Sequence, residues 1–322
     1  MTRLSNTQFK MCLIFYTLIS ITRFGCQNSK KSKECENYFW SHKFFIVHDM
    51  PYVDEATDLQ KLDLYLQGEY IGEPNYVRTD NIPHPTLIYI HGGGFVSEDK
   101  STRLNYFLHF LERGWHVVNL NYSLGEKGKE IEAVPPAVDD VMVALKRVVE
   151  HAEKCHFDLN NIVISGESAG GTLALLAGLY NTIPESHNDY IGDKIKIRAI
   201  INWFGVTDFE NVFYFYMSKS NDQQEIEITD EKKEKYGPFI LKYSPVHCIT
   251  ENAPPILTIH GNKDTVVPIE QATILHDALN AVGVRNKLLI LEGGKHVGFT
   301  DSQWRQAFSA IFEFLNYEKA KK

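Results

Sequence analysis

Short apolar runs recur along the chain, and a loop or a helical pattern follows each of them. The later runs are almost continuous in apolar residues, as in TLIYI, IVIS and KLLIL, which is typical of strands buried on both faces of a parallel sheet. The pattern predicts eight strands, at Phe44–His48, Leu62–Leu66, Thr86–His91, His116–Asn121, Ile162–Ser165, Ala199–Trp203, Ile256–His260 and Lys287–Leu291. We therefore expect an α/β fold with a mostly parallel eight-stranded sheet flanked by helices.

Helical spacing of apolar residues appears in three stretches between and after these strands. AVDDVMVALKRVVEHAEK forms one apolar stripe, and Pro135-Pro136 directly before it suits a helix start. EQATILHDALNAVG repeats the spacing and ends at Gly283, a residue type common at helix C-caps. The last predicted helix runs from Ser302 to Tyr317.

One stretch, about 208–252, interrupts the alternation of strands and helices. It holds the aromatic run VFYFYM and the charged run DQQEIEITDEKKEK, and it carries no strand signal. Long insertions inside compact domains are commonly functional or mobile. We expect a cap or lid between the sixth and seventh strands, with a solvated surface excursion as the alternative.

Composition narrows the class of protein. The chain has 322 residues, 43% of them apolar, and a formal net charge of −8, which fits a globular protein and argues against nucleic-acid binding because that requires a clustered basic surface. Its five cysteines show no C-x-x-C spacing, so we expect no metal site. The sequence allows one disulfide among Cys35, Cys155 and Cys248 but does not select the pair, and it does not determine the oligomeric state.

The N-terminal residues differ from the rest. Arg3 and Lys10 precede the apolar run MCLIFYTLISI, which is shorter than the roughly 20 residues that span a bilayer and is typical of a secretory signal. Residues 1–26 are predicted to be a signal peptide, 27–42 a tether and 43–322 the folded domain. The protein is therefore expected to be exported, into the periplasm or outside the cell, with an amphipathic or disordered leader as the alternative.

Gly25-Cys26 resembles the end of a bacterial lipoprotein signal. This resemblance implies membrane anchoring through a lipid on Cys26. The alternative is cleavage nearer Thr22, followed by plain secretion.

Ser168 stands between glycines in VISGESAGGTL. A predicted strand ends directly before it and a helical pattern begins directly after it, which is the strand–turn–helix context of a nucleophilic serine. The helix N-terminus also favours developing negative charge. The alternative for this segment is a tight turn without chemistry.

A serine hydroxyl needs a base, and the base needs an acid. His296, in LEGGKHVGF after the last strand, is the predicted base, and Asp264, in IHGNKDTVVP after the seventh strand, is the predicted acid. Both loops are expected to open at the edge of the sheet where Ser168 lies. Glu292 and Asp208 are the weaker alternatives for the acid.

Donors for an oxyanion are predicted in YIHGGGF, after the third strand. Glycines expose main-chain N–H groups that can point at an ester oxygen. We expect Gly93, Gly94 and the N–H of Ala169 to form the oxyanion hole.

HGGGF, GESAGG and the loops of Asp264 and His296 occur in the order found in the α/β-hydrolase fold. The chain resembles the HGGG-bearing esterases and lipases of that fold, related to hormone-sensitive lipase and to BD-FAE-like carboxylesterases, over about residues 43–317. QKLDLYL and VVNLNYSLG also resemble that group, which usually has an arginine where this chain has Ser123. Phe95, Trp203 and Phe299 are the hypothesised apolar wall of the substrate pocket, each with plain core packing as the alternative.

The resemblance implies hydrolysis of small or short-chain acyl esters through an acyl-enzyme, without metal or organic cofactor. If the protein is exported, the expected substrates are esters of acetyl or feruloyl groups on carbohydrate. An arylformamidase, a serine peptidase, and a lipase that uses VFYFYM as an interfacial lid are the alternatives. A non-catalytic binding protein is a further alternative, although such proteins commonly lose the serine or histidine, and both are present here.

Overall fold

The computed structural model of the chain describes residues 44–70, 77–78, 81–185, 187–192, 194–219 and 230–316. The predicted signal peptide, Cys26 and the tether lie outside the described residues. Among those described, no helix has both the length and the apolar character needed to cross a bilayer.

All eight predicted strands are present, and they form one sheet in the order β1-β2-β6-β5-β7-β8-β9-β10. From β6 to β10 every neighbouring pair is parallel, whereas β1 and β2 are antiparallel to their neighbours. The strands are β1 (Phe44–Pro51), β2 (Lys61–Gln67), β5 (His84–Ile90), β6 (His116–Leu120), β7 (Phe157–Glu167), β8 (Ile197–Trp203), β9 (Ile256–Gly261) and β10 (Asn286–Leu291). A separate pair that the pattern did not predict consists of β3 (Glu69–Tyr70) and β4 (Val77–Arg78).

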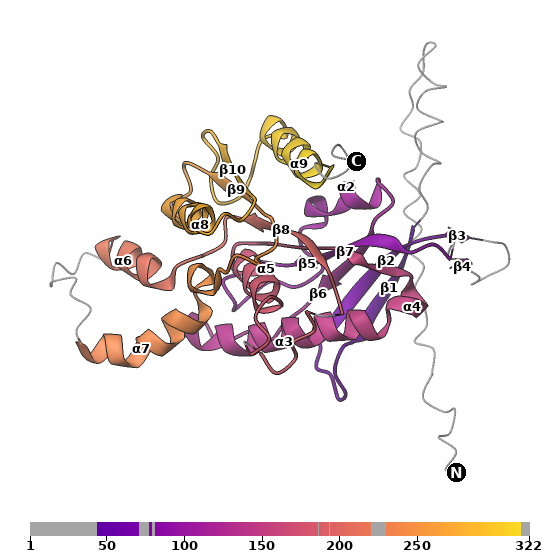
Figure 1. Ribbon diagram of the computed structural model, residues 1–322, viewed down its shortest axis with the longest axis horizontal. Helices are drawn as coiled ribbons and strands as arrows, with labels where there is room; N and C mark the ends of the chain where they lie inside the picture. The colour runs from indigo at the N-terminus through magenta and orange to yellow at the C-terminus, as the bar shows by residue number, and fades with distance from the viewer. Residues whose placement is uncertain are drawn as a thin grey trace.

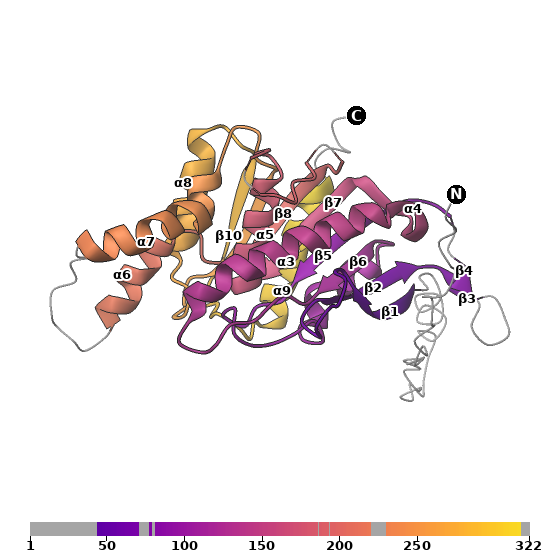
Figure 2. The same ribbon diagram turned by 90° about the horizontal axis from the view of Figure 1, so that it is seen from below.

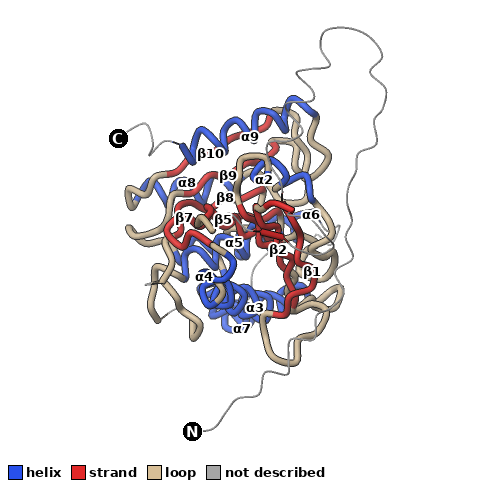
Figure 3. Tube along the Cα trace, turned by 90° about the vertical axis from the view of Figure 1, so that its right-hand side faces the viewer, coloured by secondary structure: helices blue, strands red, loops and turns tan. Residues whose placement is uncertain are grey.

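Helices cover both faces of the sheet (Figures 1 and 3). Successive side chains of a strand point to opposite faces, so Ile88 and Ile90 pack in one apolar core and Leu87 and Tyr89 in the other. The first core includes α3 (Glu130–Glu150), α5 (Ala169–Tyr180) and α8 (Glu270–Ala281), and the second includes α2 (Leu108–Leu111) and α9 (Asp301–Asn316). Three further helical segments are short: η1 (Leu104–Tyr106), α4 (Ala152–Cys155) and η2 (Pro245–Cys248).

The start of α3 corrects one prediction. The helix begins at Glu130, so Pro135 and Pro136 lie in its second turn and do not begin it. Ala133 and Val134 are buried with the later apolar stripe, and this burial extends the helix backwards past the two missing N–H donors. The end of α8 agrees with the prediction: Gly283 (φ 73°) follows it, and Val284 N–H donates to Leu279 O, as in a Schellman C-cap.

The insertion between β8 and β9 contains α6 (Phe209–Lys219) and α7 (Asp230–Tyr243). Figures 1 and 2 show both helices extending beyond the rest of the molecule at the same end. Phe209 packs against Phe239 with ring centroids 5.1 Å apart, which joins the two helices. Whether this pair caps the site stays a prediction.

Candidate functional site

Ser168 occupies the sharp turn between β7 and α5. Its backbone is in an unusual region for a non-glycine residue (φ 52°, ψ −120°), and its N–H donates to Trp203 O at 2.8 Å. The turn requires small neighbours, because a Cβ added at Gly170 would lie 2.2 Å from Ile90 O. The strain is thus maintained by close packing of three main-chain segments, as is common at functional sites.

The structure brings Ser168, His296 and Asp264 together, as the sequence predicted. Nε2 of His296 lies 3.0 Å from Ser168 Oγ, and Nδ1 of His296 lies 2.7 Å from Asp264 Oδ2. A carboxylate only accepts, so Nδ1 carries the hydrogen and Nε2 is left as an acceptor for the serine hydroxyl. Such a chain of contacts can remove the serine proton during nucleophilic attack.

The loop after β9, which carries Asp264, is hydrogen-bonded to the loop after β10, which carries His296. Lys263 N–H donates to Gly294 O at 2.8 Å. The Asn262 side chain accepts from Gly293 N–H and donates to Glu292 Oε2. The alternative acids therefore have other roles: Glu292 pairs with Asn262, and the carboxylate of Asp208 accepts from Asn211 N–H at the start of α6.

The Asp264 carboxylate is buried, with a side-chain exposure of 0%. Burial raises its pKa, but the contacts with His260 and His296 lower it by more, so the pKa lies below its ordinary value. Its other oxygen accepts N–H bonds from Val266 and Val267. The carboxylate is thus held ionised and in one orientation.

The HGGG loop follows β5 and lies directly against the turn at Ser168, since Ile90 and Gly166 are register partners. Gly93 has a φ of 93°, and a Cβ there would lie 1.9 Å from Ser97 O, so no other residue type fits. Tyr122 OH donates to the carbonyls of His91 and Gly92 and fixes the start of the loop. Ala169 begins α5, and the first amides of a helix lack partners within it. The segments predicted to supply the oxyanion donors thus lie beside Ser168, the HGGG loop against its turn and Ala169 directly after it.

The three hypothesised pocket residues are all largely buried. Trp203 is 1% exposed and packs edge-on against Tyr106, Phe95 is 5% exposed, and Phe299 is 8% exposed. Phe204, which the sequence did not single out, has its ring 4.7 Å from that of His296 and 5.7 Å from that of Phe299. Phe204 has a φ of 42°, and this strained backbone is invisible in the sequence.

Sequence reasoning also missed two charged residues beside the site. Glu167, directly before Ser168, is 2% exposed and accepts a hydrogen bond from Arg103 Nε at 2.7 Å. Burial raises the pKa of Glu167, against the lowering effect of Arg103. A glutamate at the end of a buried apolar run was a usable signal, whereas nothing in the sequence marks Arg103.

The described part of the chain has neither a metal-ligating cluster nor a disulfide. Its residues contain no group of three or more His, Cys, Asp or Glu side chains that could hold a metal ion. Cys155 and Cys248 are buried, free thiols.

Comparison with known proteins places the chain in a family. The BD-FAE family model matches residues 75–279, more than half of the chain. The chain belongs to the BD-FAE family. The match includes the HGGG loop and Ser168 and ends before His296.

Relatives and solved structures agree with this family and with the α/β-hydrolase fold. Esterase LipC of Mycobacterium tuberculosis is 29% identical over 202 residues, covering 62% of this chain and 49% of LipC. Isoprenylcysteine alpha-carbonyl methylesterase ICME of Arabidopsis thaliana is 25% identical over 268 residues, covering 81% of this chain and 58% of ICME. The chain thus spans about half the length of the curated relatives it matches.

Among solved structures, a truncated carbohydrate esterase from gut microbiota superposes with a TM-score of 0.66 at 22% identity, over 84% of this chain and 96% of that one. The esterase Est2 of Thermogutta terrifontis gives a TM-score of 0.62 at 22% identity, over 85% and 91% of the two chains. At these identities the likeness establishes the fold.

Proposed function

We propose that this BD-FAE family member is a serine carboxylic-ester hydrolase that acts through Ser168, His296 and Asp264. The observation that carries the proposal is the unbroken contact chain from Ser168 Oγ through the imidazole to Asp264, with Ser168 on a strained turn beside the HGGG loop. Relatives named as esterases support the same reaction class.

In the proposed mechanism, Ser168 Oγ attacks the ester carbonyl as its proton moves to His296 Nε2. The carbonyl oxygen becomes an oxyanion, which accepts hydrogen bonds from the main-chain N–H groups of Gly93, Gly94 and Ala169. His296 then donates the proton to the departing alkoxide, and the alcohol leaves an acyl-enzyme. Water repeats the sequence and releases the acid, while Asp264 stays ionised and orients the imidazole.

The proposed substrates are small or short-chain acyl esters, including acetyl or feruloyl groups on carbohydrate. A solved structure described as a carbohydrate esterase supports this class. Phe95, Trp203 and Phe299 are proposed to line the acyl side of the pocket, with Phe204 joining them. The proposal of export, with or without a lipid on Cys26, rests on the sequence of residues 1–26 alone.

A chain-length series of p-nitrophenyl esters, from acetate to palmitate, tests the proposal on the chain without residues 1–26. We expect turnover of the short esters, none in Ser168→Ala, and unchanged turnover in Ser302→Ala, which alters an exposed serine on α9. A fluorophosphonate should label the wild type and not Ser168→Ala. A wild type that neither hydrolyses esters nor takes the label would overturn the proposal; labelling without ester turnover would favour amide substrates instead.

A further inference from the structure

The loop that begins with the predicted oxyanion donors Gly93 and Gly94, residues 93–103, has an unusual backbone. Phe95, Glu98 and Arg103 all have left-handed φ angles, of 65°, 69° and 67°. For residues other than glycine this conformation costs energy, and it persists only where the surrounding structure holds it. The loop must therefore be anchored by something other than its own sequence.

Hydrogen bonds within the loop make it one unit. Gly93 O accepts from Val96 N–H at 3.1 Å and from Ser97 Oγ at 2.8 Å. Further along, Asp99 accepts from the N–H and hydroxyl of Ser101. These hydrogen bonds form two turns, at residues 93–97 and 99–102, which are joined directly through Glu98.

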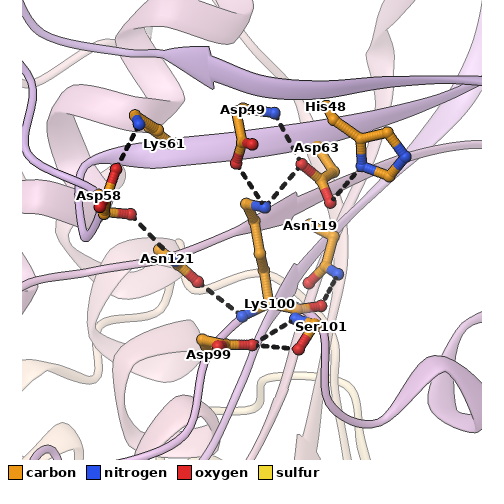
Figure 4. A network of polar contacts seen from close by, with 10 residues as sticks. All are labelled: His48, Asp49, Asp58, Lys61, Asp63, Asp99, Lys100, Ser101, Asn119 and Asn121. Carbon is orange, nitrogen blue, oxygen red and sulfur yellow. Dashed lines mark hydrogen bonds and ion pairs between the residues drawn. The ribbon is translucent and has the colours of Figure 1, made fainter. Parts of the chain in front are cut away.

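Lys100 anchors this unit to the sheet (Figure 4). Its side chain is 12% exposed, and its ammonium lies 2.9 Å from Asp49 on β1 and 2.8 Å from Asp63 on β2. Its main-chain N–H donates to the Asn121 side chain, and its carbonyl accepts from Asn119 on β6. The side chain of Lys100 is thus held by β1 and β2, and its backbone is held by β6 and the residue just beyond the end of β6.

The surrounding charges keep this anchor ionised. Burial lowers the pKa of Lys100, but the two carboxylates raise it by more, so it lies above its ordinary value. Asp63 is also held by His48 Nδ1 at 3.1 Å and by Asp49 N–H at 2.9 Å. Arg103 provides a second anchor three residues later, where it binds Glu167 next to Ser168.

We propose that Lys100 is a positioning residue for ester hydrolysis: its ion pairs with Asp49 and Asp63 hold residues 93–103 in their strained conformation and so set the N–H groups of Gly93 and Gly94 relative to Ser168. The inference rests on the proposed function. Lys100 does not touch the reacting atoms; it acts on the oxyanion through the loop.

Four variants test the role of Lys100. Lys100→Met removes the charge at similar volume, and Lys100→Arg restores a cation. Asp49→Asn weakens one ion pair at a carboxylate that is 61% exposed. Lys146→Met is the matched control, because Lys146 also pairs with an aspartate, Asp189 at 2.9 Å, but does so on the surface of α3.

The measurements are kcat and KM for p-nitrophenyl acetate, the inhibition constant of an aryl trifluoromethyl ketone, and the melting temperature. The ketone adduct places an oxyanion in the hole, so its affinity reports the donors directly. For Lys100→Met we expect kcat to fall about 10- to 100-fold, up to the loss caused by misplacing a reacting group by about 1 Å and less than full loss of an oxyanion donor, with KM nearly unchanged. Ketone affinity should fall by a similar factor, Lys100→Arg should recover part of both, and Lys146→Met should change neither.

Asp49→Asn keeps the test decisive if Lys100→Met does not fold. This variant should melt as the wild type does and lose activity and ketone affinity in parallel, by about two- to fivefold, a fraction of a full donor's contribution. Folded variants of Lys100 and Asp49 that retain wild-type kcat and ketone affinity would overturn the inference and leave the proposed function intact. An inactive, unlabelled wild type would instead overturn the proposed function itself.

Discussion

Ser168 and His296 lie on segments of very different exposure, although their side chains are hydrogen-bonded to each other. On the serine side, defined as residues 91–95 and 166–172, Glu167 and every residue of α5 are buried. On the histidine side, defined as residues 261–268 and 292–299, Lys295, Val297 and Gly298 are exposed. Close main-chain packing shapes the first, whereas the second combines one close main-chain contact, Gly261 against Gly294, with side-chain hydrogen bonds of Asn262 and Asp264.

Because of this difference, we expect substitutions on the two sides to affect stability and activity differently. A change on the serine side should disturb the fold and the chemistry together, because the same backbone contacts serve both. A change on the histidine side, away from the contact of Gly261 with Gly294, should alter the chemistry while the fold survives.

Asp264→Asn should have the largest effect on activity. The asparagine oxygen can still accept from Val266 and Val267, so the loop keeps its shape. Its amide, however, would donate towards His296 Nδ1 and impose the wrong tautomer, for which kcat falls by about 10⁴-fold in a serine–histidine–aspartate site. Steady-state kinetics beside thermal melting checks this; a large loss of melting temperature would show that the histidine side is as integral to the fold as the serine side.

Gly170→Ala and Gly298→Ala compare the two sides by stability. A Cβ at Gly170 would meet Ile90 O at 2.2 Å and His91 O at 2.4 Å, whereas one at Gly298 would meet nothing within 4 Å. We expect Gly170→Ala to lower the free energy of unfolding by about 3 kcal/mol or more. Gly298 has a φ of 81°, so its replacement should cost only about 1–2 kcal/mol, from strain. Urea unfolding of both variants measures the difference, and equal losses would contradict the contrast.

The two sides also differ in how far the sequence predicted them. Strand ends and helix starts place Ser168, Asp264 and His296 at one edge of the sheet, because carboxyl ends of parallel strands meet there. These strand ends and helix starts can be read from neighbouring residues in the sequence. Lys100, Arg103 and Phe204 act through partners far away in the chain or through strained backbone, and neither leaves a periodic signal. The start of α3 was missed for a related reason, since tertiary burial of Ala133 and Val134 outweighed the local effect of two prolines.

Acid should destabilise the serine side through His91. Burial lowers the pKa of this histidine to about 4, although Gly92 O and the charge of Asp99 raise it slightly, and its ring stacks on Tyr122. The unfolded chain binds the proton near pH 6.5 and the folded chain only near pH 4, so the stabilising contribution is complete above pH 6.5. As the pH falls between these values, the free energy of unfolding should drop by about 3 kcal/mol.

Urea unfolding at pH 7.5 and pH 4.5 measures this loss. His91→Phe keeps the stacking and removes the titration, so its stability should vary less with pH than that of the wild type. His109→Phe, at an exposed histidine paired with Glu112, is the control and should retain the wild-type dependence. An unchanged slope in His91→Phe would assign the acid sensitivity to another group.

His260 should give the smallest effect, because it supports the histidine side from behind. It is 0% exposed, its Nε2 donates to Val267 O at 2.9 Å, and the same atom lies 3.4 Å from Asp264 Oδ2. Losing this donor removes one of the contacts that lower the pKa of Asp264, and a less stabilised carboxylate holds the His296 imidazolium more strongly. His260→Met should therefore shift the acid limb of kcat/KM towards higher pH and lower kcat by about tenfold or less. His260→Gln retains an N–H donor and should shift the limb less. If both variants keep the pH–rate profile of the wild type, His260 only fills space, and the orientation of Asp264 depends on Val266, Val267 and His296 alone.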